Sequence, residues 1–282
     1  MKIVTAVVNN VDFIEIQYYT LKKYFKGEYE FIVFNDAKDF PDFTNDGDVT
    51  IKNKIEELCS RLKIKCINIP NANHKLIKDP STRTANSMNF ILKYQMLNRD
   101  KYLLLDSDMF LVDYFDINKY SKYDCAVVLQ SRNDYKINYF WNGIYYFDML
   151  KMKNIKALNW NCSPGCDTGW MTQWWLLSQI KNDEIPKTDD LRLSGKDFHT
   201  ENIYFMKHFW SCSWDRKELP ETLNNNTKLI EFLENDIRNE NNKFFCEIYD
   251  DVFLHYRAGG NWRGEGLHLH KKITQDLKEA LI

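Results

Sequence analysis

The strongest constraint on the fold is an alternation of short apolar runs with amphipathic helical patterns along the first half of the chain. This alternation is typical of an α/β sheet whose strands are joined by helical crossovers. Strands are predicted over residues 3–8, 31–34, 64–69, 102–105, 125–129 and 143–147. Helices are predicted over residues 14–24, 49–62 and 80–97, the last with Asp79 as its N-cap and Pro80 in its first turn.

The second half of the chain has a less regular pattern. It contains a Trp-rich helical stretch over about 167–180, an Asn-rich segment at 224–226 and a strand-like run over 252–256. The final segment, 267–282, is amphipathic and predicts a terminal packing helix, with peripheral contact to a membrane surface as the alternative. Because no repeat and no Ser/Gly linker interrupts the 282 residues, we expect one continuous domain over 1–282.

Composition excludes several classes of protein. A net charge of -2 and a pI near 6.3 argue against a general nucleic-acid binder. The seven cysteines are odd in number and lack paired C-x-x-C spacing, even at the closest pair, Cys162 and Cys166. They indicate reduced thiols and a cytoplasmic location. We expect no transmembrane segment and no signal peptide, because the apolar runs are short.

The run from Lys101 to Val112, KYLLLDSDMFLV, carries the most specific chemistry. A short apolar strand ends in Asp106, Ser107 and Asp108, so two carboxylates lie close together at the end of a buried strand. Keeping both charged is costly, and a divalent cation such as Mn²⁺ or Mg²⁺ would remove that cost. An Asx-rich turn after the strand is the structural alternative.

Two other polar groups follow strands of the same predicted sheet. They are Val8 to Asn10 and the pair Asn35-Asp36. Ligands of open α/β sheets bind at the carboxyl ends of the strands, so we expect these groups to share one crevice with Asp106 and Asp108. They could contact a nucleoside whose phosphates are held by a metal, although polar residues after strands are also common turn formers.

A third group lies far downstream, in the segment FLHYRAGGNWR. His255 can ligate a metal, while Gly259 and Gly260 allow backbone N–H groups to approach phosphate. Arg257 and Arg263 add positive charge that suits a diphosphate. A polar loop anchored by Trp262 is the alternative.

The order LLLDSD, YFWNGIYYFDM, GCDTG and FLHYRAGGNW resembles the retaining glycosyltransferases of family eight, which include glycogenin and the bacterial lipopolysaccharide galactosyltransferases. The resemblance implies a GT-A fold, a nucleotide-sugar donor, most often a UDP-sugar, and Mn²⁺. The family's metal ligands correspond to Asp106, Asp108 and His255. Its nucleoside contacts fall near Ala6, Val8 and Asn10. Its turn beneath the donor sugar resembles Trp141-Asn142-Gly143, and its segment beside the reacting sugar best matches Asp167-Thr168-Gly169.

The chain also departs from the family pattern. Thr168 replaces a Gln that has been discussed as a nucleophile, and a phosphate-contacting Lys is missing, which leaves Arg257 or Arg263 as substitutes. Arg83 and Lys93 are the candidates for a basic residue on the helix before the acids. The predicted donor-binding residues are therefore Ala6, Val8, Asn10, Asp36, Arg83, Lys93, Ser107, Arg257, Gly259, Gly260 and Arg263.

These features predict transfer of a sugar from a nucleotide-sugar to a glycan or another protein- or lipid-linked hydroxyl acceptor, with retention expected. Residues 1–130 would form the half that binds the nucleotide-sugar, and 131–282 the half that binds the acceptor and carries the C-terminal metal-ligand segment. Asp167 and Asn142 are the candidate catalytic residues. Asp167 would orient the donor sugar in a retaining reaction or act as general base in an inverting one, and an N-cap is its structural alternative. Trp141, Trp170 and Trp262 could line a sugar pocket, although core packing is the simpler role.

Two other functions remain open from the sequence. Haloacid-dehalogenase-like phosphatases also carry Asp-x-Asp after an apolar strand, and Asp250-Asp251 could imitate their later acidic pair. Their motif continues with a Thr where this chain has Phe110. The other alternative is a non-catalytic carbohydrate-binding protein, which would bind sugars without nucleotide or metal.

Overall fold

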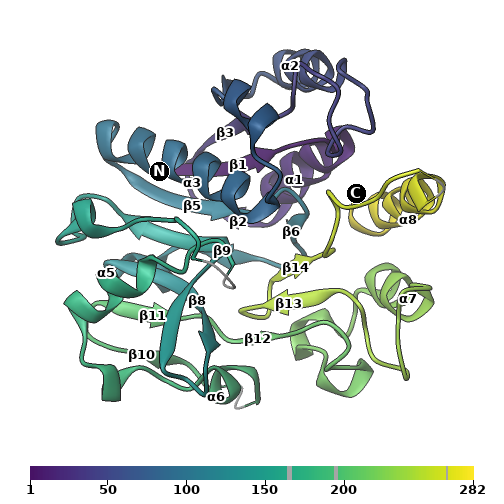
Figure 1. Cartoon of the computed structure of the whole chain (residues 1–282). Helices are drawn as coiled ribbons and strands as arrows, with labels where there is room; N and C mark the ends of the chain where they lie inside the picture. The colour runs from purple at the N-terminus through teal and green to yellow at the C-terminus, as the bar shows by residue number, and fades with distance from the viewer. Residues whose placement is uncertain (164–166, 194–195, 265) are drawn as a thin grey trace.

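The computed structural model describes residues 1–163, 167–193, 196–264 and 266–282. Within these ranges, eight strands form one mixed sheet through the middle of the molecule (Figure 1). Its order is β10 (Phe198–His199), β11 (Ile203–Phe205), β8 (Cys125–Arg132), β9 (Ile137–Asp148), β5 (Lys101–Leu105), β1 (Lys2–Val7), β3 (Glu30–Asn35) and β4 (Lys65–Asn68). β1 is parallel to β3 and β5, whereas β9 is antiparallel to β5 and β8. The predicted mixed sheet is confirmed.

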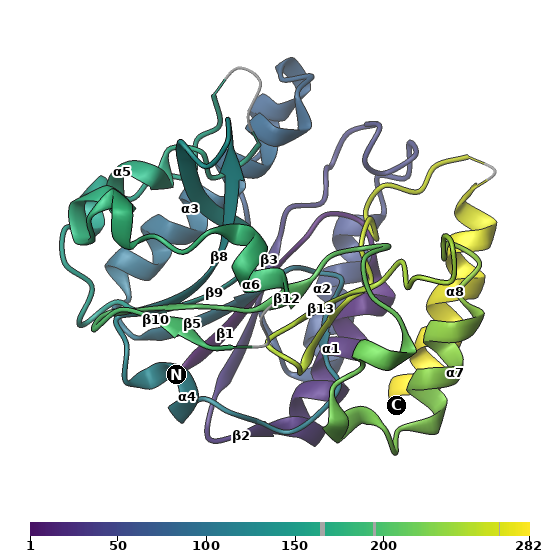
Figure 2. The same cartoon turned by 90° about the horizontal axis from the view of Figure 1, so that it is seen from below.

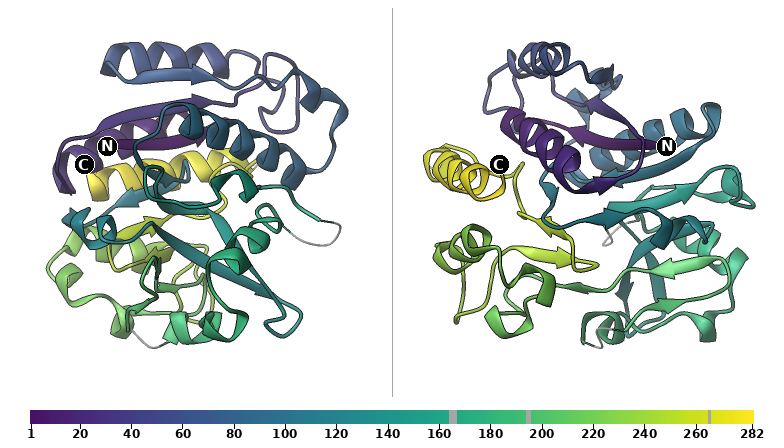
Figure 3. Two further views of the ribbon diagram at one scale, coloured as in Figure 1. Left: turned by 90° about the vertical axis from the view of Figure 1, so that its left-hand side faces the viewer. Right: turned by 180° about the vertical axis from the view of Figure 1, so that it is seen from behind.

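Helices cover both faces of this sheet. Side chains alternate between the faces of a strand, so Ile3 and Leu103 belong to the core beneath α1 (Val11–Tyr24) and α2 (Ile51–Leu62). Val4 and Leu104 belong to the opposite core, with α3 (Pro80–Leu97) and α5 (Thr172–Gln179). Figure 3 shows α1 and α2 on one side of the sheet and α3 on the other. This burial on both faces explains the continuous apolar runs in the sequence.

A second, smaller sheet supports the C-terminal part of the chain. Its order is β12 (His208–Phe209), β13 (Glu247–Tyr249), β14 (Phe253–His255) and β6 (Met109–Leu111). α7 (Thr227–Asn235) and α8 (Gly266–Leu281) lie side by side next to it (Figure 2). Ile273 and Leu277 of α8 are buried in the core that these elements share. The C-terminal helix thus directs its apolar face inward, as expected of a terminal packing helix.

The remaining elements are short. β2 (Phe25–Lys26) and β7 (Phe115–Asp116) pair with each other, and α4 (Asn118–Ser121) and α6 (Thr188–Leu193) are single helical turns or slightly longer. The 3-10 turns are η1 (Ala72–Leu76), η2 (Ile155–Ala157), η3 (Asn182–Glu184), η4 (Arg216–Glu218) and η5 (Glu221–Leu223). In the ranges that the structure describes, no helix is both long and apolar enough to cross a membrane.

The sequence predicted the start of one helix correctly and the start of another incorrectly. Asp79 caps α3 by accepting the Thr82 N–H at 2.8 Å, as predicted. The Trp-rich helix was expected from about Asp167, but α5 begins only at Thr172. Asp167 is therefore not the N-cap of α5; its carboxylate accepts the adjacent Thr168 N–H at 2.7 Å. The described cysteines are free, and Cys166 lies outside the described residues.

The acidic motif lies where the chain passes from one sheet to the other. β5 ends at Leu105 in the large sheet, and β6 begins at Met109 in the small sheet. Asp106, Ser107 and Asp108 make the connection between the two sheets. This junction is also the carboxyl end of β5, where ligands bind in open α/β sheets.

Candidate metal and nucleotide site

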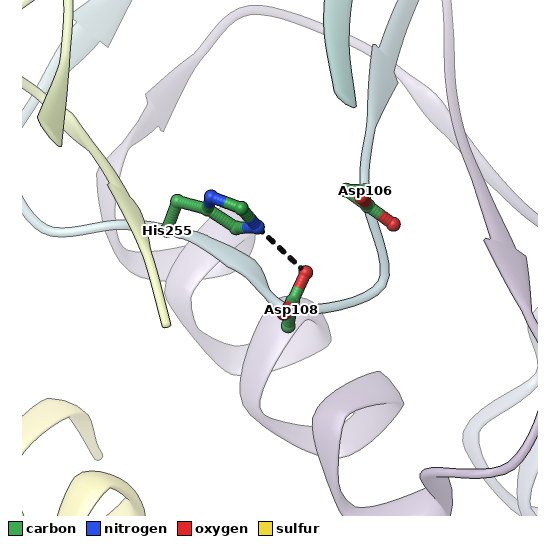
Figure 4. Close-up of side chains that lie close together, drawn as sticks. All are labelled: Asp106, Asp108 and His255. Atoms are coloured by element: carbon green, nitrogen blue, oxygen red, sulfur yellow. Dashed lines mark hydrogen bonds and ion pairs between the residues drawn. The ribbon is translucent and has the colours of Figure 1, made fainter. Parts of the chain in front are cut away.

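Three residues that are distant in sequence meet at the junction of the two sheets. One ligand atom from each of Asp106, Asp108 and His255 lies within 4.8 Å of the others. The cause is the register of the small sheet, in which His255 on β14 pairs with Met109 at the start of β6. Figure 4 shows the His255 ring and the Asp108 carboxylate directed at each other. We call these three residues the triad.

Asp108 is the most firmly held member. It is 4% exposed, its Oδ1 lies 3.1 Å from His255 Nε2, and its Oδ2 accepts the Gly259 N–H at 2.8 Å. Burial acts to raise the pKa of Asp108, but the charge and hydrogen bond of His255 and the Gly259 N–H outweigh it and lower that pKa. Asp108 is therefore held as a carboxylate.

Asp106 is partly exposed and less well compensated. Its Oδ1 accepts only the adjacent Ser107 N–H at 2.8 Å, while its own N–H donates to the Gly143 carbonyl at 2.6 Å. Burial and the negative charge of Asp108 raise the pKa of Asp106 to about 7. A positive ion between the two carboxylates would relieve this repulsion.

His255 connects the triad to a further carboxylate. Its Nδ1 lies 2.8 Å from Glu247 Oε2, and the residue is 6% exposed. Burial acts to lower the pKa of His255, but Asp108 and Glu247 raise it well above its usual value. The ring therefore has a carboxylate partner on each nitrogen.

The donor set fits a divalent cation. Carboxylate oxygens suit Mg²⁺ and Mn²⁺, and an imidazole nitrogen adds a ligand that transition metals accept readily. The three donor atoms already lie close enough together to share one ion after small side-chain rotations. Asp106, Asp108 and His255 are thus the residues that could hold a metal.

A cleft of about 360 Å³ opens beside the triad. Gly259, which binds Asp108, also lines this cleft, together with the predicted residues Asn10 and Arg263. The Trp262 ring stacks on His270 with centroids 5.6 Å apart on the same wall. Its size and its mixture of aromatic and polar groups suit a small organic ligand.

The loop after β14 has a backbone that directs Gly259 toward Asp108. Arg257 and Ala258 adopt φ values of 66° and 58°, in the left-handed region that residues other than glycine rarely adopt. A Cβ on Gly259 would lie 2.4 Å from a Phe13 ring carbon and 2.8 Å from Asp108 Cβ. Only glycine fits at position 259 without displacing these atoms.

The two arginines of this loop have different partners. Arg257 Nε lies 3.4 Å from Glu247 Oε1, and its Nη1 donates to Ser211 Oγ at 3.1 Å. Arg263 Nη1 donates to the carbonyls of Gly260 and Trp262, at the edge of the cleft. Both guanidinium groups therefore lie near the loop, although neither contacts the triad through the bonds observed.

Two of the predicted donor-binding residues belong to a buried ionic network instead. Asp36 is 4% exposed and accepts Lys38 Nζ at 2.8 Å. Arg83 donates from Nη1 to both oxygens of Asp42 at 2.8 Å. Lys93 lies on the exposed side of α3. The structure thus does not bring Asp36, Arg83 or Lys93 into contact with the triad. Ala6 lies near the end of β1, and Val8 directly follows that strand.

The candidate catalytic residues lie in different elements: Asn142 belongs to β9, and Asp167 lies in the segment before α5. Asn142 precedes Gly143, whose carbonyl binds the Asp106 N–H, so Asn142 lies close to the acidic motif. Asp167 is exposed and accepts the Ser81 hydroxyl at 3.1 Å, at the start of α3. Its observed hydrogen bonds do not reach the triad.

Two of the three candidate tryptophans, Trp141 and Trp262, lie at the site, and Trp170 does not. The Trp141 ring stacks on Tyr249 with centroids 4.8 Å apart and lies 5.3 Å from the His255 ring. Trp262 lines the cleft, whereas Trp170 packs edge-on against Trp174. Trp141 and Trp262 therefore border the site.

Two residues of the site, Gln17 and Glu247, were not predicted from the sequence. Gln17 of α1 donates to the backbone carbonyls of Asp106 and Met109. Asn9, which belongs to the predicted group Val8 to Asn10, donates to the backbone carbonyls of Thr44 and Gly260. Apolar residues flank Asp250-Asp251 as they do in a hairpin, but they do not set the register that places Glu247 opposite His255.

The acidic pair of the phosphatase hypothesis lies elsewhere. Asp250 and Asp251 form the turn between β13 and β14, with φ values of 51° and 69°. The buried Asp250 carboxylate accepts the hydroxyls of Tyr120 and Tyr204 at 2.7 and 2.8 Å. These bonds give Asp250 a structural role at the opposite end of the hairpin from His255.

Comparison with known proteins adds similarities in structure only. No protein-family model matches the sequence, and no curated protein matches it either. The structure is similar to galactosyltransferase LgtC in complex with donor and acceptor sugar analogues (TM-score 0.38, 13% identity, covering 56% of this chain and 62% of LgtC). It is also similar to an active-site mutant of LgtC (TM-score 0.39, 13% identity, 56% and 61%) and to the WbbM bifunctional glycosyltransferase (TM-score 0.35, 14% identity, 53% and 31%).

The chain thus covers less than two thirds of the length of each of these proteins. Because the TM-scores and identities are low, we base the functional proposal on the side chains of the site.

Proposed function

We propose that this chain is a metal-dependent glycosyltransferase of the GT-A type, which transfers a sugar from a nucleotide-sugar donor to a hydroxyl acceptor. The observation that carries the proposal is the meeting of Asp106, Asp108 and His255 at the carboxyl end of β5, beside a cleft. The resemblance to family eight implies a UDP-sugar as donor and Mn²⁺ as the ion, with Mg²⁺ as the alternative.

The proposed chemistry follows from charge. Asp106, Asp108 and His255 would hold a divalent cation, which would supply positive charge opposite the diphosphate leaving group. Asp106 and Asp108 bring the negative charge that binds such a cation, and Arg257 and Arg263 add positive charge on the adjacent loop. Nucleoside contacts are assigned to the end of β1 and to the cleft, through Ala6, Val8 and Asn10.

The sugar and the acceptor are assigned to the second half of the chain. Asn142 would contact the donor sugar next to Asp106, and Trp141 would offer an aromatic face. Asp167 would orient the donor sugar in a retaining reaction, or remove the acceptor proton in an inverting one. Residues 1–130 are assigned to the nucleotide-sugar half, and 131–282 to the acceptor half with the C-terminal metal-ligand segment.

Thermal unfolding with a panel of nucleoside diphosphates, each with Mn²⁺ or with a chelator, tests this function. A ligand at a hundred times its dissociation constant stabilises the fold by about 2.7 kcal/mol, which raises the melting temperature by several degrees. We expect this shift with UDP and Mn²⁺ and its loss with the chelator. A chain that hydrolyses simple phosphoesters and shows no shift with any nucleotide would contradict the proposal.

A further inference from the structure

Glu247 is a buried carboxylate adjacent to the triad. It lies on β13 directly opposite His255 on β14, and only 2% of it is exposed. A carboxylate this far from water destabilises the fold unless hydrogen-bond donors surround it. The identity of those donors therefore indicates what Glu247 does.

Four groups contact the two carboxylate oxygens. Oε2 lies 2.8 Å from His255 Nδ1 and accepts the Tyr249 hydroxyl at 2.8 Å. Oε1 accepts the Ser211 N–H at 3.2 Å and lies 3.4 Å from Arg257 Nε. Because these groups come from β13, β14 and the segments after β12 and β14, the position of the carboxylate is fixed from several sides.

This fixed carboxylate determines how the His255 ring is presented. A carboxylate can only accept a hydrogen bond, so it favours a proton on the Nδ1 that faces it. Nε2 lies 3.1 Å from Asp108 Oδ1 and so faces the triad; a cation bound there would displace the proton that this contact favours on Nε2 and leave its lone pair to the metal. The Trp141 ring, 5.3 Å from the His255 ring, restricts the ring from a third direction.

From this geometry we infer that Glu247 is a positioning residue, which orients His255 so that Nε2 faces Asp106 and Asp108 as a metal ligand. The inference rests on the proposed function, since it assigns Glu247 a task only if the triad binds a cation. Carboxylates in this position raise the basicity of a ligating imidazole and fix its orientation. A purely structural carboxylate would contribute to folding without affecting metal affinity.

Mn²⁺ binding to the full-length chain, measured from the electron paramagnetic resonance signal of free Mn²⁺ without nucleotide, tests the inference. Glu247→Gln keeps the shape of the side chain and removes its charge. We expect it to weaken Mn²⁺ binding by roughly 10- to 100-fold. Asp250→Asn is the matched control, because Asp250 is also 2% exposed and lies on the same hairpin, but binds Tyr120 and Tyr204 instead of His255.

The outcomes separate the inference from the proposed function. Equal Mn²⁺ affinity in wild type and Glu247→Gln, with binding abolished by Asp108→Asn, would overturn the role of Glu247 and leave the metal site standing. A wild-type chain that binds no Mn²⁺ would overturn the proposed function itself. An equal loss of affinity in Asp250→Asn would also overturn the inference, because it would reduce the effect to a general loss of hairpin stability.

A second measurement needs no substitution at Glu247 and therefore does not depend on that variant folding. Long-range ¹H–¹⁵N spectra report which ring nitrogen of each of the six histidines carries a proton. With saturating Mg²⁺, we expect His255 to be protonated at Nδ1 and not at Nε2. A His255→Gln sample assigns the signal, and a proton on Nε2 in the metal-bound state would overturn the inference.

Discussion

Gln17 and Asp106 are joined by a hydrogen bond of 2.7 Å, in which the Gln17 side-chain amide donates to the Asp106 backbone carbonyl. The same nitrogen donates to the Met109 carbonyl at 2.9 Å, so one side chain of α1 binds both ends of the acidic turn. Gln17 is completely buried, and water cannot replace these bonds without rearrangement. The spacing of Asp106 and Asp108 therefore depends on a residue of α1 that carries no charge.

Replacing Gln17 tests this dependence. Among the described residues, Gln17→Met removes the donor of the Met109 carbonyl and leaves the Asp106 carbonyl with the Met109 N–H alone, at 3.1 Å, which destabilises the fold by about 1–3 kcal/mol. We expect Mn²⁺ affinity to fall as well, because the turn that presents the carboxylates loosens. Chemical denaturation and Mn²⁺ titration measure the two effects.

Gln95→Met is the matched control for that substitution. Gln95 is also completely buried and hydrogen-bonds the Tyr145 hydroxyl at 3.1 Å, on the opposite face of the sheet. It should lose stability and keep its metal affinity. Equal affinity in both variants would show that Gln17 serves folding alone.

Asp106→Asn is expected to remove metal binding while the fold stays intact. Asp106 is partly exposed, and its carboxylate accepts only the adjacent Ser107 N–H, which an Asn carbonyl can also accept. Removing its charge also removes the repulsion from Asp108, so the metal-free variant should be at least as stable as wild type. The measurement is thermal unfolding with UDP, with and without Mn²⁺.

Asp113→Asn provides the control for Asp106→Asn. Asp113 accepts the N–H of the next residue, Tyr114, at 2.7 Å in the same local arrangement, but lies outside the triad. Its variant should keep the full stabilisation by UDP and Mn²⁺. If Asp106→Asn also kept it, the metal hypothesis would be wrong.

Gly259→Ala should damage both the fold and the site. The added methyl group would lie 2.4 Å from the Phe13 ring and 2.8 Å from Asp108 Cβ, and overpacking of this kind costs about 1–3 kcal/mol. The shift of Asp108 should weaken Mn²⁺ binding at the same time. Gly260→Ala is the control, because its nearest neighbour is Asn9 Oδ1 at 3.6 Å. Similar stability and metal affinity in the two variants would contradict this account of Gly259.

The sequence predicted those parts of the site whose signals are local. The apolar run followed by Asp106 and Asp108 can be recognised in the sequence without knowing which residues it contacts in the fold. The same is true of a His followed by glycines. Asp79 and Pro80 likewise mark the start of α3 by their own chemistry. The meeting of the two acids with His255 was anticipated from the resemblance to family eight, and not from spacing, because 147 positions separate Asp108 from His255.

Other features depend on pairings that no local pattern reveals. The run after Asp108 resembles a continuation of the same strand, yet Met109 enters a different sheet. Asp36 and Arg83 have the chemistry of ligand contacts, but Lys38 and Asp42 neutralise them within the fold. The role of Glu247 becomes visible only once the β13–β14 register is known. Each of these cases requires long-range contacts that the residues themselves do not specify.

Asp167→Asn separates a catalytic role from a structural one. Asp167 is exposed and binds Ser81 and Thr168, so the substitution should change stability by less than about 0.5 kcal/mol. If Asp167 acts on the sugar or the acceptor, turnover should fall at least tenfold while UDP affinity stays constant. Ser81→Ala removes the Asp167 contact alone and should retain turnover. A loss of stability without a loss of turnover would return Asp167 to a structural role.

The stability of the chain should decrease in weak acid because of His208. This residue is 2% exposed, and burial lowers its pKa to about 4, with Arg192 acting in the same direction and the Met206 carbonyl and Glu247 opposing. An unfolded His has a pKa of about 6.5, so both states are neutral at pH 8. As the pH falls from 6.5 to 4, His208 takes up a proton in the unfolded state but not in the folded state. The free energy of unfolding therefore decreases over that pH range.

His208→Phe measures the contribution of that residue. The ring keeps its size, and the proton uptake disappears, so the loss of stability between pH 7 and pH 5 should shrink by about 2 kcal/mol relative to wild type. Urea denaturation at the two pH values gives this difference. His199→Phe, measured in the same way, is the control for replacing a histidine by phenylalanine, because His199 is exposed on β10. An unaltered pH dependence in His208→Phe would mean that the folded chain accepts the proton as readily as the unfolded one.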